Sequence, residues 1–178
     1  MKKSQIVQGV IFVALLALIF FGVHSVIEAK DANGECMEPH IYDGNLFMVV
    51  KAAYWFDEPA RGDVIVFLYP GNISQEYVKR VIGLPGETID IENESVYVNG
   101  SLLTEPYVNG PTLPKGYGYD HVVLQQGQYF VMGDNRQFSS DSRTWGVVPR
   151  ENIIGRAYLV YWPLHNWYLL HGYSYSPS

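Results

Sequence analysis

Residues 133–146 read GDNRQFSSDSRTWG and concentrate two Asp, two Arg, three Ser and one Asn in fourteen positions. Carboxylates accept bidentate hydrogen bonds from guanidinium groups, and hydroxyl groups bridge the donors that remain. This composition indicates a closed hydrogen-bond network rather than an ordinary solvent-exposed loop. We expect the network to hold another part of the chain in place.

From residue 45 onward the sequence is typical of β-strands, because short β-branched and aromatic runs are bounded by Gly, Pro, Asn and Asp. Strands are predicted at 46–51, 63–68, 77–83, 87–92, 95–98, 128–132 and 156–162. The pair Asn99-Gly100 suits a type I′ turn and predicts a hairpin over 95–103. Residues 107–121, rich in Gly, Pro and Tyr, are expected to form an exposed loop. No long helix is predicted after residue 28, so the predicted fold class is mostly β.

Length and composition exclude several classes of function. The 178 residues allow one membrane anchor and one domain of about 150 residues. A net charge of -6 argues against a nucleic-acid partner, which requires clustered cations. The single cysteine, Cys36, excludes an intrachain disulfide and a cysteine-cluster metal site. The five histidines lack the spacing of a helical zinc motif, so neither a metal nor another cofactor is expected.

Residues 6–26 are almost wholly apolar and predict a membrane-spanning helix, which needs about 20 residues to cross a bilayer. Lys2 and Lys3 precede this run, and the positive-inside tendency places the N-terminus in the cytoplasm. The predicted organisation is a cytoplasmic segment 1–5, a single transmembrane anchor 6–27 and an extracytoplasmic β domain 28–178. A cleaved signal peptide is the alternative, but the run is long for one and no clean small-x-small pattern follows it.

Three stretches carry a resemblance to a known family. Together with residues 133–146, YVKRVIGLPG at 77–86 and GECMEPHI at 34–41 resemble three ordered motifs of the type I signal peptidases, the bacterial leader peptidase family with a Ser/Lys dyad. The resemblance extends from residue 34 to about residue 155. It implies a signal-peptidase-like β domain and a membrane-anchored endopeptidase that cleaves N-terminal signal peptides. Its partners would be exported preproteins and the lipids of the cytoplasmic membrane.

The resemblance assigns the catalytic roles to Cys36 and Lys79. Cys36 occupies the position of the nucleophilic serine, and Lys79 that of the general base. Lys79 and Arg80 are adjacent on a predicted apolar strand and must point to opposite faces, so one of them points inward. A buried lysine loses the solvation of its ammonium group, which favours the neutral amine that a base requires.

Further residues are expected to support this dyad or to contact substrate. By resemblance, Ser139, Asp141 and Arg143 orient the lysine and brace the site, and Gly133 leaves room for the lysine side chain. Arg80 and Asp134 are expected to support the site from behind it. The predicted substrate contacts are Met37, Pro39 and Tyr77.

A cysteine nucleophile changes the expected chemistry. A thiol ionises more readily than an alkyl hydroxyl, so the demand on Lys79 as a base falls. The larger sulfur atom, however, displaces the attacked carbonyl within a site that is matched to oxygen. The backbone N–H of Cys36 would supply one oxyanion donor, whereas Gly34 lacks the hydroxyl that often supplies a second in the family.

Two other functions are open. One is a substrate-binding homologue in which the change from Ser to Cys has weakened or abolished catalysis. The other is a sortase-like cysteine transpeptidase, for which His121 would be the partner of the thiol. The aromatic residues near the C-terminus are consistent either with a core or with a belt at the membrane interface. These residues are Tyr158, Tyr161, Trp162, Trp167, Tyr168, Tyr173 and Tyr175.

Overall fold

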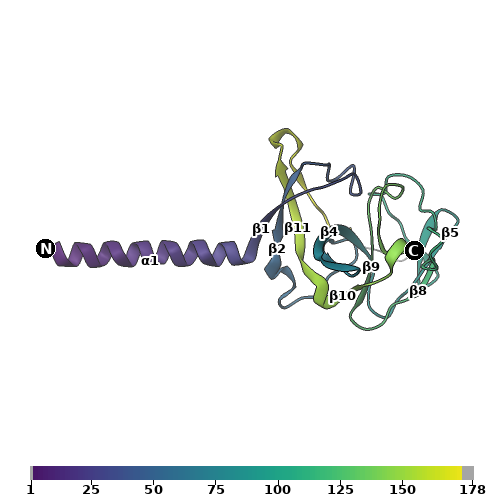
Figure 1. Cartoon of the computed structure of the whole chain (residues 1–178), viewed down its shortest axis with the longest axis horizontal. Coiled ribbons are helices and arrows are strands. Elements are labelled where there is room, and N and C mark those ends of the chain that lie inside the picture. Colours follow the sequence, from purple (N-terminus) through teal and green to yellow (C-terminus); the bar gives the residue numbers. More distant parts are fainter. Residues whose placement is uncertain (1, 174–178) are drawn as a thin grey trace.

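A computed structural model describes residues 2–173 and consists of one long helix that leads into a β domain (Figure 1). The helix, α1, comprises Lys2–Val26 and ends one residue before the predicted boundary of the anchor, because Ile27 begins a strand. Its described apolar side chains between Val7 and Leu18, such as Val10 and Phe12, are exposed. Over the residues described here, no helix has the combination of length and hydropathy required to span a membrane.

The larger sheet contains eight strands in the order β1-β2-β11-β3-β4-β9-β10, with β12 also paired to β11. Every pairing in it is antiparallel. Its strands are β1 Ile27–Asp31, β2 Leu46–Val50, β3 Val64–Tyr69, β4 Asn72–Gly83, β9 Gln128–Met132, β10 Val148–Pro149, β11 Ile153–Trp162 and β12 Tyr168–Leu169.

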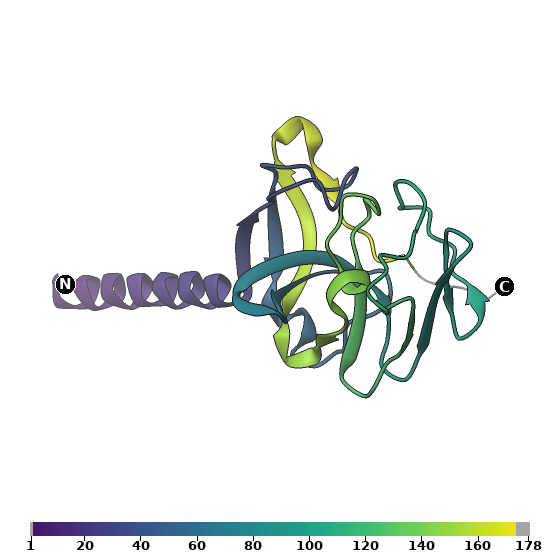
Figure 2. The same ribbon diagram turned by 45° about the vertical axis from the view of Figure 1, so that its right-hand side comes forward.

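A smaller sheet of four strands has the order β7-β6-β5-β8 and lies at the end of the domain away from α1 (Figures 1 and 2). Its strands are β5 Thr88–Glu92, β6 Ser95–Val98, β7 Ser101–Leu102 and β8 His121–Val123. The predicted hairpin is confirmed in β6 and β7. Asn99 and Gly100 have φ angles of 51° and 79°, and a type I′ turn requires positive values at both central residues.

The seven predicted strands are all present, and the mostly β fold class is confirmed. The prediction of an exposed loop over 107–121 was wrong in part. Tyr107 and Thr112 are buried, because the Tyr107 ring packs against Arg80 and Tyr173 while the Thr112 hydroxyl accepts a hydrogen bond from Arg136. The remaining elements are short helical turns: η1 Lys51–Tyr54, α2 Ser142–Trp145, η2 Arg150–Asn152 and η3 Leu164–Asn166.

The larger sheet is strongly curled. Three strands separate β1 from β4 in the strand order, yet Lys30 Nζ on β1 lies 2.7 Å from Glu76 Oε2 on β4. The curled face encloses a core that includes Phe47 and Val66, and the segment between β1 and β2 packs onto this core. The edges of β1 and β4 are thereby brought to the same cavity.

The C-terminal aromatic residues differ in burial, and only the core interpretation is confirmed for some of them. Tyr168 packs against the core of the larger sheet and Tyr173 against that of the smaller sheet. Trp162 and Trp167 are exposed, as a membrane contact would require. Tyr175 lies outside the described residues.

Candidate active site

The segment that carries Cys36 is a turn fixed at both ends. Gly34 has a φ of 87°, a conformation that glycine adopts readily, and its N–H donates to Asp43 Oδ1 at 2.7 Å. Met37 O accepts hydrogen bonds from the N–H groups of His40 and Ile41, at 3.0 and 2.9 Å. Met37 and Ile41 are each 1% exposed and anchor the turn in the core, while Cys36 stays half-buried.

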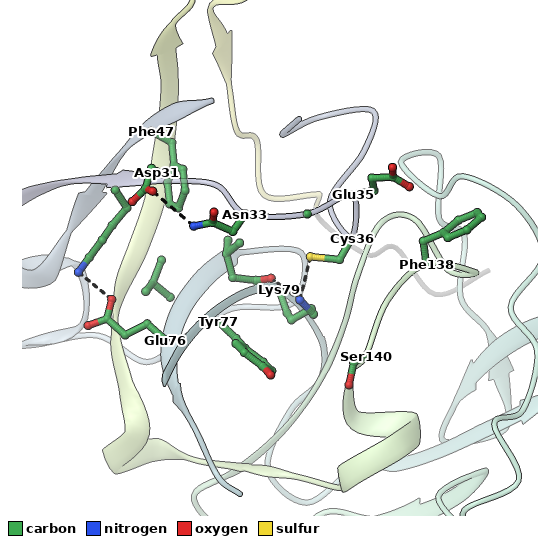
Figure 3. A pocket seen from close by; sticks show the side chains of 14 residues that line it. Asp31, Asn33, Glu35, Cys36, Phe47, Glu76, Tyr77, Lys79, Phe138 and Ser140 are labelled. Carbon is green, nitrogen blue, oxygen red and sulfur yellow. Dashed lines mark hydrogen bonds and ion pairs between the residues drawn. The ribbon is translucent and has the colours of Figure 1, made fainter. Parts of the chain in front are cut away.

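The structure brings Cys36 and Lys79 into contact. Lys79 lies on β4 and is 4% exposed, and its Nζ lies 3.0 Å from Cys36 Sγ (Figure 3). The same nitrogen donates to the carbonyl of Val78 at 2.9 Å and lies 5.4 Å from the centre of the Tyr77 ring. These contacts aim the lysine nitrogen at the sulfur.

On the other face of β4, Arg80 is buried beneath the site. Its guanidinium donates two hydrogen bonds to Asp134, at 2.7 and 2.6 Å, and one to the carbonyl of Gly62 at 2.7 Å. His40 Nδ1 lies 2.9 Å from Asp134 Oδ2. Burial alone would raise the pKa of Asp134, but the interactions with Arg80 and His40 outweigh it and hold this pKa below its usual value. Asp134 therefore stays ionised and links β4 to the Cys36 turn.

The predicted hydrogen-bond network over 133–146 is present. Asp141 caps α2 by accepting from the N–H of Arg143, and the Arg143 side chain donates to both carboxylate oxygens, at 2.9 and 2.7 Å. Arg143 also donates to the carbonyl of Arg136, whose side chain pairs with Glu105 at 2.9 and 2.5 Å. Burial alone would raise the pKa of Asp141. Its interactions with Arg143 lower this pKa by more than burial raises it, so the net shift is downward.

Gly133 provides space for a different group from the one expected. A Cβ placed there would lie 2.4 Å from Cys36 O and 2.4 Å from Ser139 Oγ, so its nearest neighbours are Cys36 and Ser139 rather than Lys79. Ser139 is buried and helps to lower the pKa of Asp141. Its Oγ meets hydrogen-bond geometry with no described group, so its role in orienting Lys79 stays a prediction.

Asn135 contacts the candidate site, and the sequence reasoning missed it. Its N–H donates to Cys36 O and its side-chain amide to Glu35 O, each at 3.1 Å. These two bonds fasten the polar stretch 133–146 directly to the Cys36 turn. Its place inside this polar stretch was a signal, but an asparagine there does not reveal its partner.

A cavity of about 350 Å³ lies beside Cys36 and Lys79. Its wall includes Phe47, Val66 and Tyr77, so the predicted contact at Tyr77 lies in the cavity. The rim is polar and includes Lys30, Asp31, Asn33, Glu35, Glu76 and Ser140 (Figure 3).

Two predicted substrate contacts do not lie in this cavity. Met37 is buried in the core, and Pro39 lines a separate hollow with Tyr42 and Trp167. Both residues lie within three positions of Cys36 in sequence, but the turn that closes at Ile41 directs them away from it.

The arrangement also bears on the alternative function that involves His121. His121 is exposed on β8, its Nδ1 lies 2.5 Å from Asp90 Oδ1, and it does not line the cavity with Cys36. The sortase-like interpretation, which needs His121 beside the thiol, is therefore wrong. Among residues 2–173, no group of three His, Cys, Asp or Glu side chains is arranged to hold a metal ion.

The comparison with known proteins decides the family. The family model of signal peptidase, peptidase S26, matches residues 5–162. The chain belongs to the signal peptidase family, peptidase S26. The resemblance seen in the three motifs is thus confirmed as membership of the type I signal peptidases.

Relatives in this family include two proteins of Synechocystis sp. The probable signal peptidase I-1 is 37% identical over 184 residues, which cover 99% of this chain and 90% of that protein. The probable signal peptidase I-2 is 38% identical over 144 residues, 78% of this chain but only 65% of that longer protein. A signal peptidase I structure from Enterococcus faecalis V583 is 34% identical and covers 56% of this chain and 97% of its own, with a TM-score of 0.49.

Within the signal peptidase family, the candidate site of this chain places a thiol and an amine in contact at the wall of a cavity that is lined in part by apolar side chains. The contact between Cys36 and Lys79 is sufficient for proton transfer from a thiol to an amine. Two buried ion pairs lie next to this contact, one between Arg80 and Asp134 and one between Arg143 and Asp141. Both aspartates stay ionised and fix the elements that carry the site.

Proposed function

We propose that this signal peptidase is anchored in the cytoplasmic membrane and removes N-terminal signal peptides from exported preproteins, with Cys36 and Lys79 as its catalytic dyad. The observation that carries the proposal is the 3.0 Å contact between Lys79 Nζ and Cys36 Sγ at the wall of a cavity. The enzyme is a hydrolase of the signal peptidase I type.

In the proposed mechanism, neutral Lys79 accepts the thiol proton as Cys36 Sγ attacks the scissile carbonyl. The backbone N–H of Cys36 donates to the oxyanion that forms. Lys79 then gives its proton to the departing amine, which leaves a thioester between the signal peptide and Cys36. Lys79 removes a proton from water, the hydroxide attacks the thioester, and the protonated lysine returns its proton to the thiolate, which restores both groups.

The proposed substrate lies extended between the facing edges of β1 and β4. The pairing of β4 with β9 runs from Arg80 to Gly83, so the part of β4 before Arg80 has β3 on one side and the cavity on the other. A peptide added there would gain main-chain hydrogen bonds, and the pocket formed by Phe47, Val66 and Tyr77 would receive its side chains.

The proposed membrane anchor is α1, with the β domain on the extracytoplasmic side. Its sequence is almost wholly apolar from residue 6 to residue 26, and Lys2 and Lys3 precede this apolar run. The described side chains of its middle part, including Val13 and Leu18, are exposed and have no domain to pack against. A bilayer would bury them.

The proposed roles of the supporting residues follow from their contacts. Asp141 and Arg143 brace the segment that carries Ser139, and Arg80 with Asp134 fixes β4 behind Lys79. Gly133 lets this segment approach the Cys36 turn. Ser139 is proposed to hydrogen-bond to Lys79 once substrate closes the site.

The test uses the purified full-length protein in detergent, incubated with a secretory preprotein. Three forms are compared: the natural chain, Cys36→Ser and Cys36→Ala. We expect Cys36→Ala to cleave nothing and Cys36→Ser to cleave at least as well as the natural chain. Equal processing by all three forms would exclude Cys36 as the nucleophile.

A second candidate is a preprotein-binding homologue with little turnover, and the lysine–sulfur contact itself favours it. A stable thiolate–ammonium pair would leave Lys79 protonated and unable to act as a base. The same experiment separates the two functions, because a binding homologue would retain preprotein without cleavage in the natural form. Activity that appeared only in Cys36→Ser would support this second function.

A further inference from the structure

An ion pair crosses the cavity at a distance from the dyad. Lys30 Nζ on β1 lies 2.7 Å from Glu76 Oε2 on β4, and both side chains line the cavity. Figure 3 shows Glu76 in this ion pair on the far side of the cavity from Cys36. The pair joins the two strand edges between which the substrate is proposed to lie, and the proposed mechanism makes no use of it.

The pair belongs to a short chain of charges. Lys30 also lies 2.6 Å from Glu28, and Glu28 lies 2.7 Å from Lys51. Burial lowers the pKa of Lys30, but the interactions with Glu28 and Glu76 outweigh it, so Lys30 stays cationic at neutral pH. The side chains of Lys30 and Glu76 are 21% and 38% exposed. Pairs with this much solvent contact contribute little to stability and open readily.

The position of Glu76 relates the ion pair to the scissile bond. Glu76 precedes Lys79 by three residues on β4, which corresponds to about 10 Å along a strand. An extended substrate has the same rise for each residue. Its third or fourth residue from the attacked carbonyl would therefore lie beside Glu76. Along the chain, Lys30 lies between α1 and Cys36, so the pair occupies the end of the cavity that leads toward the proposed anchor.

We propose that Lys30 and Glu76 determine specificity by sensing the charge of the signal-peptide residue three or four positions before the cleaved bond. The inference rests on the proposed function of the cavity. A signal peptide arrives from the membrane and enters from the end that leads toward α1. An uncharged residue leaves the ion pair intact. An acidic residue competes with Glu76 for Lys30, and a basic residue competes with Lys30 for Glu76, so either charge disfavours binding.

Charge reversal gives this proposal a direct test. Glu76→Lys places two cations at the end of the cavity and should favour an acidic substrate residue over a basic one. Lys30→Glu places two anions there and should favour the basic residue. The double variant Lys30→Glu/Glu76→Lys restores a neutral pair with the strands exchanged, and should remove both preferences. Glu151→Lys is the matched control, since this exposed residue lies on η2 and does not line the cavity.

The experiment measures kcat/KM for full-length protein in detergent with one preprotein that carries Ala, Asp or Lys at the third or the fourth position before the cleaved bond. We expect the natural enzyme to prefer Ala and to treat Asp and Lys alike. The ratio of kcat/KM for the Asp substrate to kcat/KM for the Lys substrate should rise roughly threefold to tenfold in Glu76→Lys. The same ratio should fall by a similar factor in Lys30→Glu. Both changes should shrink in 0.5 M salt, because partly exposed charges are screened.

The possible outcomes separate this proposal from the proposed function. One outcome is that Glu76→Lys cleaves preprotein with the same ratio of kcat/KM for the Asp and Lys substrates as the Glu151→Lys control. That outcome would overturn the specificity role of Lys30 and Glu76 but not the proposed function. Failure of both the natural form and Cys36→Ser to cleave any preprotein would overturn the proposed function, and the specificity role with it. If Lys30→Glu fails to fold beside Glu28, Glu76→Lys still decides the question, since it leaves β1 unchanged.

Discussion

At the scale of single residues, the candidate site depends on the lack of a side chain at Gly133. The Cβ that Gly133 lacks would lie 2.4 Å from Cys36 O and from Ser139 Oγ, a distance that real Cβ contacts do not reach. The same Cys36 carbonyl accepts the N–H of Asn135, which fixes its position. Close approach of three chain segments at one point therefore requires glycine there.

Gly133→Ala should displace the Cys36 turn and separate Sγ from Lys79. We expect kcat/KM for preprotein cleavage to fall by roughly 100-fold, the usual effect of a displacement of about 1 Å at a reacting group. The free energy of unfolding should fall by about 1–3 kcal/mol from overpacking. Enzyme kinetics and urea titration measure the two effects. Gly9→Ala is the control, because its added Cβ would meet no described atom within 4 Å apart from its chain neighbours and the backbone of its own helix. Unchanged activity of Gly133→Ala would contradict the prediction.

Lys79→Met retains length and an apolar stem but removes the proton acceptor. At neutral pH, we expect cleavage to fall by at least about 100-fold in both the Cys36 and the Cys36→Ser backgrounds. Above about pH 8.5 a thiol ionises without a base, so the Cys36 background should recover slightly and the serine background should not. The measurement is a pH profile of preprotein cleavage, with circular dichroism as the test of folding. Near-normal cleavage by a folded Lys79→Met protein at neutral pH would exclude Lys79 as the base.

At the scale of elements, the short helix α2 is held by a buried ion pair at its N-terminus. Asp141 and Arg143 are both 0% exposed, and Asp141 also accepts the N–H of Gly133 at 3.2 Å. The carboxylate thus joins the start of α2 to the residue that adjoins the Cys36 turn. Loss of this carboxylate would affect folding and the site together.

Asp141→Asn should lower the free energy of unfolding at pH 7 by about 3–5 kcal/mol, because it leaves Arg143 buried without its counter-charge. The folded pKa of Asp141 is depressed below the reference value of 3.8. Its stabilising effect is therefore complete above about pH 4 and disappears as the pH falls through the lowered pKa. Urea titrations between pH 7 and pH 2 should show that acid lowers the free energy of unfolding less in Asp141→Asn than in the unsubstituted protein. The exposed change Asp57→Asn serves as control, and equal pH profiles for both variants would contradict the prediction.

The sequence predicted those strands whose residues form a pattern by themselves. The run Leu46–Val50 and the hairpin at Asn99-Gly100 are local signals, and both are present. Strand β1, with the sequence IEAKD, was missed because three of its five residues are charged and only its pairing with β2 makes it a strand. Two-residue strands such as β10 have no pattern that could predict them.

The candidate site was predictable where a motif fixed the residue and not where tertiary geometry did. Lys79 was proposed from its strand and motif, and it does lie in contact with Cys36. Met37 was misplaced because proximity to Cys36 in sequence does not reveal that the turn directs its side chain into the core. The hydrogen bond from Asn135 to Glu35 joins residues a hundred positions apart, and no local pattern encodes it.

At the scale of the whole molecule, the order of elements relates the cavity to the proposed membrane. α1 ends at Val26 and continues directly into β1, which supplies Lys30 and Asp31 to the cavity. The smaller sheet lies at the opposite end of the domain (Figure 2). If α1 spans the bilayer, only about ten residues separate the end of the anchor from Cys36. This short distance would keep Cys36 within reach of a signal peptide embedded in the same membrane.

The proposed orientation of the chain rests on the two lysines at the start of α1. Lys2 and Lys3 precede the apolar run, and cationic flanks stay in the cytoplasm, so the β domain should lie outside the cell. Protease added to intact protoplasts should then digest the chain beyond residue 28 and spare a cytoplasmic marker protein. Replacing both lysines by glutamate should weaken this bias and protect a fraction of the molecules. Full protection of the natural chain until detergent is added would place Cys36 and Lys79 on the cytoplasmic side, where they could not act on a translocated preprotein.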